Sequence, residues 1–175
     1  MPILEQEARF QNDVDMKTFT EFTTDAPLTE TFNTVYPWHL VRDTLTLSMY
    51  EFTVPIKTGS QQVTVEIWAD TGNRESPDHA VSVIFTVGRR IDTTGLGDDV
   101  KFGIFATVVD TIKDYIKKYH PHTILFSAEK SKTGSDARER LYTALVRRFA
   151  DAAGYQFLQK TNYKQGMVVF SLRRK

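Results

Sequence analysis

The chain has 175 residues, of which 41% are hydrophobic and 25% are charged, and this composition is that of an ordinary globular domain. It contains no Cys, which excludes disulfides and thiolate metal ligands and fits a reducing, cytoplasmic setting. The N-terminus lacks a basic stretch followed by an apolar one, and no window approaches the ~18 apolar residues of a membrane span, so neither export nor membrane insertion is expected.

The charges are divided unevenly along the chain. Residues 1–87 carry 5 Lys/Arg and 13 Asp/Glu, whereas residues 88–175 carry 17 and 9. A basic half can attract a phosphate-bearing cofactor, a nucleic acid or an acidic partner, or it can consist of solvated helix faces. Charge alone leaves these alternatives open.

The first predicted elements are short helices followed by a hairpin. Hydrophobic residues at near-helical spacing predict one or two short helices within residues 1–40. From Thr44 to Phe52 the pattern has a period of two residues, which predicts a strand. Turn residues at 57–60 and a second alternating run at 63–69 then predict an antiparallel hairpin.

A central strand and a long helix come next. Residues 80–87 are almost continuously apolar, as in a strand covered on both faces. An apolar stripe predicts a helix whose opposite face carries Lys113, Asp114, Lys117 and Lys118; the stripe consists of Phe102, Phe105, Val108, Val109, Ile112, Tyr115 and Ile116. Pro121 ends this helix, and residues 123–127 form a short buried strand.

The C-terminal part predicts a second helix and a closing hairpin. Ser135 or Asp136 can cap the helix, and Gly154 is suited to its C-terminal end. Residues 155–161 and 167–172 then form the hairpin. Both helical stripes are expected to cover one core, which includes Phe102, Phe105, Val109, Leu125, Leu141 and Leu145.

This element order predicts one α/β (α+β) domain over residues 1–175, with a variable part at 1–43 and a core at 44–172. The expected sheet is mixed and mostly antiparallel, because short turns join the early strands whereas a helix connects residues 80–87 to 123–127. Helices are expected to pack on the faces of this sheet.

One fragment adds a family resemblance. Residues Ser135–Tyr142 form a predicted helix with a Leu-Tyr pair, and Gly154-Tyr155 opens the next strand. With the element order, this resembles the GNAT superfamily of N-acetyltransferases over roughly residues 44–172. Uncharacterised GNAT-like proteins of bacteriophages are similar over residues 94–105 and 126–155, which implies a phage protein located in the host cytoplasm or the virion.

The resemblance implies that acetyl-CoA binds at the turn Asp92–Gly97. In the family, glycines in this turn let backbone N–H groups approach the pyrophosphate at a helix N-terminus. The glycines match, but Asp92 replaces the family's Gln or Arg, and Asp98 and Asp99 follow. The implied cofactor contacts are Arg90, Gly95, Leu96, Gly97, Lys101 and Arg138. Alternatively, Gly95 and Gly97 merely shape a turn with an acidic cap.

The resemblance places Tyr142 as the acid that protonates the leaving thiolate, a role that suits a phenol with a pKa of about 10. Glu66 and Glu129 are the candidate bases, and each is also an ordinary surface residue. Tyr142 can equally be core filler. The four His residues form no metal-binding spacing, so no metal is expected.

Three functions stay open from the sequence. The first is an acyl-coenzyme A-dependent N-acyltransferase in which splayed central strands admit the thioester and an unknown amine attacks it. The second is a non-catalytic GNAT-like phage structural or host-interaction protein, favoured by the altered phosphate turn. The third is nucleic-acid binding through the basic half, which lacks a recognisable module.

Overall fold

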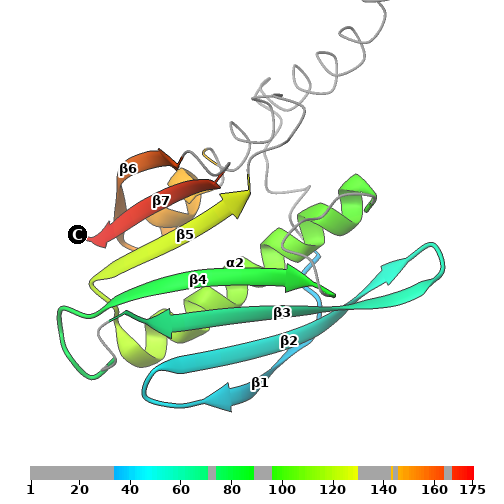
Figure 1. Cartoon of the computed structure of the whole chain (residues 1–175), viewed down its shortest axis with the longest axis horizontal. Coiled ribbons are helices and arrows are strands. Elements are labelled where there is room, and N and C mark those ends of the chain that lie inside the picture. The colour runs from blue at the N-terminus through cyan, green and yellow to red at the C-terminus, as the bar shows by residue number, and fades with distance from the viewer. Residues whose placement is uncertain (1–33, 71–73, 89–95, 130–142, 144–145, 164–166) are drawn as a thin grey trace, which may run out of the picture. The chain divides into compact units, whose positions relative to one another are not determined.

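The computed structural model describes residues 34–70, 74–88, 96–129, 143, 146–163 and 167–175 (Figure 1). Within them lie seven strands and the 22-residue helix α2 (Asp98–Tyr119). The strands are β1 (Trp38–Asp43), β2 (Leu47–Ile56), β3 (Gly59–Ala69), β4 (Ala80–Val87), β5 (Thr123–Glu129), β6 (Tyr155–Tyr163) and β7 (Met167–Arg174). Residues 146–152 are also helical.

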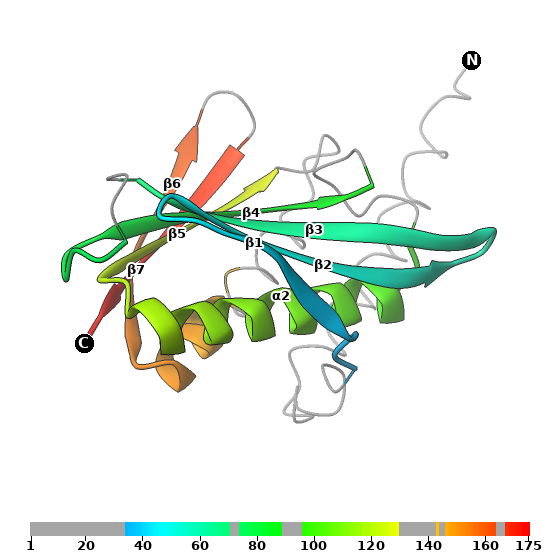
Figure 2. The same ribbon diagram turned by 90° about the horizontal axis from the view of Figure 1, so that it is seen from below.

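All seven strands belong to one sheet, in the order β1-β2-β3-β4-β5-β7-β6. Every neighbouring pair is antiparallel except β4 and β5, which run parallel because α2 returns the chain across the sheet. Figure 2 shows α2 lying along one face of the sheet, with the helical residues 146–152 on the same side. The predicted mixed, mostly antiparallel α+β fold is therefore confirmed.

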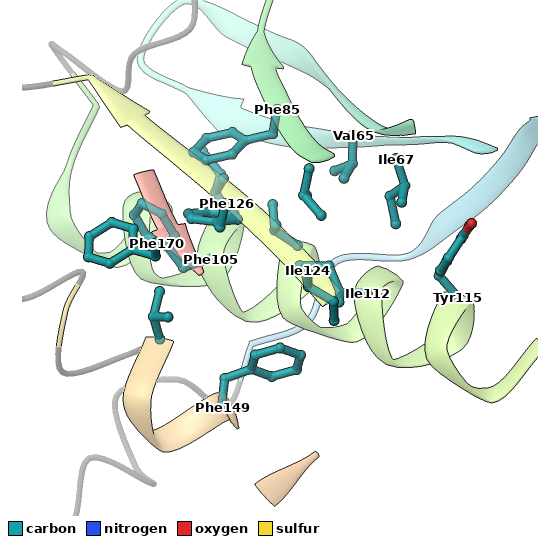
Figure 3. Packing of buried hydrophobic residues seen from close by; sticks show 14 of the residues in the cluster. Val65, Ile67, Phe85, Phe105, Ile112, Tyr115, Ile124, Phe126, Phe149 and Phe170 are labelled. Carbon is teal, nitrogen blue, oxygen red and sulfur yellow. The ribbon is translucent and has the colours of Figure 1, made fainter. Parts of the chain in front are cut away.

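One hydrophobic core lies between α2 and the sheet (Figure 3). Alternate residues of β3 and β4 are buried on the helix side, and Ile104, Val108 and Ile112 of α2 pack against them. Val146, Phe149 and Ala150 extend the same core under the C-terminal strands. The apolar stripe that predicts α2 thus identifies its buried face.

The hairpin predicted around residues 57–60 is confirmed, since β2 and β3 pair from Leu47↔Trp68 to Ile56↔Gly59. Gly59 has a φ of 135°, a region that favours glycine. The ends of the two helical segments also agree with the sequence: α2 stops before His120, and Gly154 follows residues 146–152 with a φ of 78°. Leu141 and Leu145 lie outside the described residues.

The sequence analysis does not predict β1, which begins at Trp38 and extends the sheet ahead of Thr44. The register with β2 shifts between Leu40 and Arg42, so Val41 is an extra residue in the ladder. This irregularity interrupts the period-two pattern that would have indicated a strand. Residues 1–33 lie outside the described part of the chain.

Two further expectations are corrected. Leu125 does not share the core face with Phe102 and Phe105, because it lies between the buried Ile124 and Phe126 on β5 and is only partly buried. Successive strand residues point to opposite faces, so a run of three apolar residues cannot all face α2. Asp114 does not simply face solvent, since its carboxylate accepts a hydrogen bond from the Tyr50 hydroxyl at 3.0 Å.

The described helices include none that combines the length and the apolar character needed to cross a membrane.

Candidate active site where two central strands diverge

The parallel strands β4 and β5 pair over only part of their lengths. The ladder runs from Ala80↔Thr123 to Val83↔Phe126 and then stops, whereas β4 continues to Val87 and β5 to Glu129. Figure 1 shows the two strands separating toward these ends. Beyond Val83, β4 keeps its pairing with β3 but has no ladder partner in β5. Among the described strands, the edge of residues 84–87 that faces β5 therefore has no partner.

Three aromatic side chains meet at this divergence on the side of α2. The rings of Phe85 and Phe126 are stacked, with centroids 6.3 Å apart and planes 24° apart. Phe105 of α2 meets Phe85 edge to face at 5.6 Å. All three side chains are buried, and Figure 3 shows them pointing toward one another. The helix side of the divergence is thus filled with packed rings.

The N-terminus of α2 follows β4 and begins at a glycine. Gly97 is the N-cap residue, with φ −63° and ψ 155°, and because it has no side chain it makes no capping hydrogen bond to the first turn. The first N–H groups of a helix lack partners within the helix, and they favour anions. A Cβ added at Gly97 would meet no atom of the described residues within 4 Å.

The charges near this helix start are mixed. Asp99 is exposed in the first turn of α2, Lys101 is partly buried, and Leu96 packs against the core. Burial raises the pKa of Tyr36, and the nearby Asp99 carboxylate raises it further. The predicted contacts Leu96, Gly97 and Lys101 are therefore together at one helix end, with an opposing carboxylate among them.

Glu66 lies on the face of the sheet that is turned away from α2. It sits on β3 between the buried Val65 and Ile67, and its backbone pairs with Ile84, the first β4 residue beyond the ladder with β5. The indole N–H of Trp68 donates a hydrogen bond of 2.9 Å to its carboxylate. Glu66 therefore lies on the strand next to β4, opposite the residue at which β4 and β5 begin to diverge.

The structure describes little of the remaining predicted site residues. Tyr142, Arg90, Gly95 and Arg138 are outside the described residues. Glu129 is the last residue of β5 and pairs with Met167, but only its backbone is described. Their roles stay predictions.

The His residues have structural contacts. The backbone N–H of His122 donates to the carbonyl of His79 at 3.0 Å, and this bond joins the starts of β4 and β5. The buried His79 ring places Nδ1 2.7 Å from the Ser76 carbonyl oxygen. His120 is the C-cap of α2, with a φ of 49°. Among the described residues, no three His, Asp or Glu side chains are grouped to hold a metal ion.

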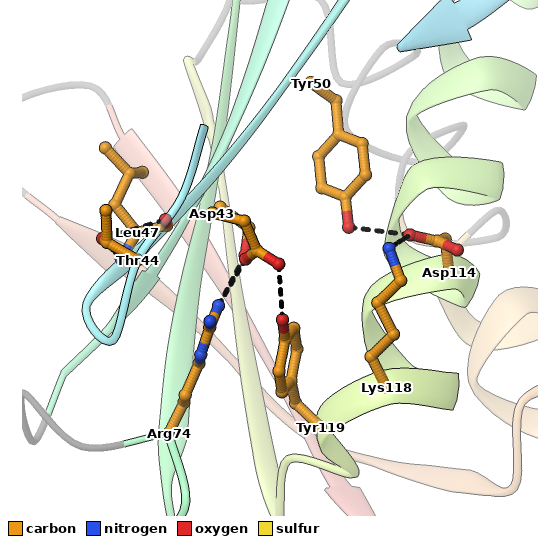
Figure 4. Close-up of polar contacts among 9 residues, drawn as sticks. Asp43, Thr44, Leu47, Tyr50, Arg74, Asp114, Lys118 and Tyr119 are labelled. Carbon is orange, nitrogen blue, oxygen red and sulfur yellow. Dashed lines mark hydrogen bonds and ion pairs between the residues drawn. The ribbon is translucent and has the colours of Figure 1, made fainter. Parts of the chain in front are cut away.

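A polar cluster that the sequence pattern does not indicate joins the C-terminal end of α2 to the sheet (Figure 4). The Asp43 carboxylate pairs with Arg74 and accepts hydrogen bonds from Ser48 at 2.7 Å and from Tyr119 at 2.6 Å. The guanidinium of Arg74 lies 4.0 Å from the centroid of the Tyr119 ring. Asp43, Arg74 and Tyr119 are distant from one another in sequence, so only the folded chain brings them together.

This cluster is remote from the divergence. The 22 residues of α2 span about 33 Å at about 1.5 Å per residue, and Tyr119 is at the opposite end from Gly97. Burial raises the pKa of Asp43, but hydrogen bonds from Tyr119, Ser48 and Arg74 outweigh burial and hold that pKa below its usual value. The cluster therefore acts as an anchor for α2 and the segment after β3.

Comparisons with known proteins give limited similarity. No family model and no curated protein matches the chain. Two solved structures of AAC(6')-Ib are similar, one in complex with paromomycin and acetyl-CoA and the other with ribostamycin and coenzyme A. Each has a TM-score of 0.39 and 10% sequence identity over 75% of this chain. The match covers 66% and 65% of the two chains, so this chain spans a little under two thirds of their length.

Proposed function

We propose that this chain is an acyl-coenzyme A-dependent N-acyltransferase. The observation that carries the proposal is the early end of the β4–β5 ladder, since the GNAT resemblance implies splayed central strands that admit a thioester. An extended pantetheine arm carries amide groups, which match the backbone N–H and C=O groups along the unpaired edge of residues 84–87. The helix end at Gly97 lies next in the chain after this strand.

The start of α2 is the proposed phosphate site. Gly97 supplies no side-chain cap to the first-turn N–H groups, and a Cβ there would meet no described atom within 4 Å, so an anion can accept hydrogen bonds from this backbone. Lys101 adds a positive charge on the next turn, and Arg90 and Arg138 are proposed to add two more. Asp99 opposes this binding, which predicts a weak rather than a tight site.

The bound acyl-coenzyme A supplies the acyl group. Glu66 is the proposed base: it accepts a proton from the substrate ammonium, directly or through water, because it is only partly buried and its carboxylate lies beside Ile84 on the face of the sheet away from α2. The freed amine attacks the thioester carbonyl, a C–N bond forms and the C–S bond breaks. The second proton lost from nitrogen balances the proton that the sulfur receives, for which Tyr142 is the proposed donor.

The proposed acceptor approaches from the face opposite α2, because packed rings fill the other side of the divergence. An amine is the expected nucleophile, and its identity is left to experiment. The resemblance to bacteriophage proteins, and with it a virion location, stays a prediction. If no coenzyme A binds, the alternatives are that the chain is a non-catalytic interaction domain or a nucleic-acid-binding domain.

Calorimetry with coenzyme A and acetyl-CoA tests the proposal, and Gly97 offers a matched pair of variants. Gly97→Ser and Gly97→Asp both supply an N-cap oxygen, so both should preserve or raise the thermal stability of the chain. Only Gly97→Asp adds a negative charge beside the proposed phosphates. We expect Gly97→Asp to lose affinity about 10-fold relative to Gly97→Ser. No binding to the parent chain at millimolar ligand would contradict the proposed function.

Turnover is then measured as thiol release with a panel of amines and polyamines. Glu66→Gln keeps the hydrogen bond from Trp68 but cannot accept a proton, so it should lower kcat by roughly 100-fold with little change in acetyl-CoA affinity. Glu51→Gln, on the neighbouring strand β2, is the control and should retain its activity. Unchanged turnover in Glu66→Gln would exclude Glu66 as the base.

A further inference from the structure

We propose that the stacked pair Phe85–Phe126 closes the acyl end of the donor site, so that the chain accepts only short acyl groups such as acetyl and propionyl. This inference rests on the proposed function, because it concerns the same donor site. It adds a substrate class that follows from the packing of this chain's own side chains.

The position of the pair gives the first argument. Phe126 is the last β5 residue in the ladder, and Phe85 is the second β4 residue beyond it. Their rings therefore stand where the two strands begin to separate, with centroids 6.3 Å apart. A thioester that lies between the strands with its acyl group directed to this apex meets the two rings first.

The packing behind the pair gives the second argument. Phe105 of α2 braces Phe85 edge to face, and Phe126 pairs across the strands with Phe170 of β7, which is fully buried. Phe85, Phe105 and Phe126 are 7%, 7% and 8% exposed, so neither ring of the pair has solvent to move into. Protein interiors are close-packed, so a longer acyl chain has to displace a ring against its neighbours.

The opposite face of the divergence gives the third argument. There the alternating residues are Ile84 of β4 and Ser127 of β5, which are only partly buried, and Glu66 lies beside Ile84. The attacking amine and the proposed base need this face. An acyl chain that extends from this face toward the helix side meets Phe85 and Phe126, which limit its length.

Binding measurements test this without a known acceptor. The probes are coenzyme A, acetyl-CoA, butyryl-CoA and hexanoyl-CoA, titrated by calorimetry into the parent chain and into Phe85→Leu, Phe126→Leu and Phe126→Ala. In the parent chain we expect acetyl-CoA to bind at least as tightly as coenzyme A, and hexanoyl-CoA to bind at least 10-fold more weakly. In the variants we expect the ratio of hexanoyl-CoA to acetyl-CoA affinity to rise 10-fold or more.

Phe52→Leu is the matched control, because Phe52 is equally buried on the same face of the sheet but lies on β2, away from the divergence. It should leave the chain-length preference unchanged. Thermal unfolding identifies any variant that fails to fold. If Phe126→Ala unfolds, the two Leu variants still provide the test, because a Leu side chain keeps more of the Phe volume in the core than Ala does. If the parent chain binds hexanoyl-CoA as tightly as acetyl-CoA, this inference is overturned, whereas the proposed function is not. Failure to bind coenzyme A itself would overturn the proposed function.

Discussion

Asp43 shows how one carboxylate can hold several separate parts of this fold together. It accepts from Ser48 on β2 and from Tyr119 on α2, and it pairs with Arg74 in the segment between β3 and β4. Tyr115 lies beside this group, with its ring 4.8 Å from that of Tyr119, and burial raises its pKa to about 12. Both phenols therefore stay protonated at neutral pH, and the Tyr119 hydroxyl donates its hydrogen bond to the Asp43 carboxylate.

Replacing Asp43 with Asn should lower the free energy of unfolding at pH 7 by about 1–3 kcal/mol, because charge-assisted hydrogen bonds are lost while their donors remain. The native pKa of Asp43 is held below its usual value, so its contribution is present above the unfolded pKa of about 4 and disappears as the pH falls through the native pKa. Urea unfolding at pH 7 and at pH 3 measures both effects.

The matched control is Asp151→Asn, whose carboxylate is 78% exposed and pairs with Lys175 at 3.4 Å. Exposed ion pairs contribute little to stability, so this change should cost less than ~1 kcal/mol. A loss in Asp43→Asn that equals the control loss at pH 7, or that persists undiminished at pH 3, would show that the cluster does not anchor the helix.

The individual elements show why sequence patterns predict some parts of this fold and miss others. Residues 80–87 are predicted to the residue because a nearly continuous apolar run is a local property of the sequence. β1 is missed because the irregularity at Val41 hides its period. The point at which the β4–β5 ladder stops is also hidden, because register depends on contacts between strands that are separated by α2.

The candidate site was predictable only in part for the same reason. Gly97 and Leu96 follow from a local motif, and the structure places them at the start of α2 as expected. The stacking of Phe85 on Phe126 joins two strands 41 positions apart in the sequence, and the Asp43 cluster joins segments 76 positions apart. Pairwise contacts at such separation leave no periodic signal in one sequence.

At the level of elements, residues 36–38 are tied to α2. The backbone N–H of Tyr36 donates to Thr107 at 2.9 Å, the indole N–H of Trp38 donates to Asp110 at 2.9 Å, and the Tyr36 ring stacks on Phe52 at 6.1 Å. Gly103 makes this possible, because a Cβ there would lie 2.5 Å from the Tyr36 ring.

A double-mutant cycle tests this contact. Gly103→Ala alone should destabilise the chain by about 1–3 kcal/mol, because the added methyl group displaces a packed ring. In a Tyr36→Ala background the same change should stabilise it by about 0.5–1 kcal/mol, because Ala favours the helix interior over Gly. Chemical unfolding of the four proteins gives the coupling energy. An equal effect of Gly103→Ala in both backgrounds would show that the ring does not occupy that space.

On the scale of the whole molecule, the unequal charge of the two halves sets how anions are attracted. Residues 88–175, which include α2 and all the proposed phosphate contacts, carry 17 Lys/Arg and 9 Asp/Glu. Excess positive charge draws a polyphosphate toward this half, and salt screens the attraction, with a Debye length of about 10 Å at 0.1 M. Coenzyme A affinity should therefore fall as ionic strength rises.

Asp99 is the exception within this basic half, and it gives the last prediction. It is exposed in the first turn of α2, where a carboxylate stabilises the free helix but repels a bound phosphate. Asp99→Asn should therefore tighten coenzyme A roughly 2- to 5-fold at low ionic strength, the range expected for one exposed charge pair, and less at 0.5 M salt. The control is Asp78→Asn, which removes the same charge from another exposed residue. Asp78 precedes the start of β4, and this end of the strand lies away from the first turn of α2, so the change should leave the affinity unchanged. Calorimetry at two salt concentrations separates the two variants. An equal gain in both would indicate a general charge effect, whereas no gain in Asp99→Asn would place the phosphates away from the α2 N-terminus.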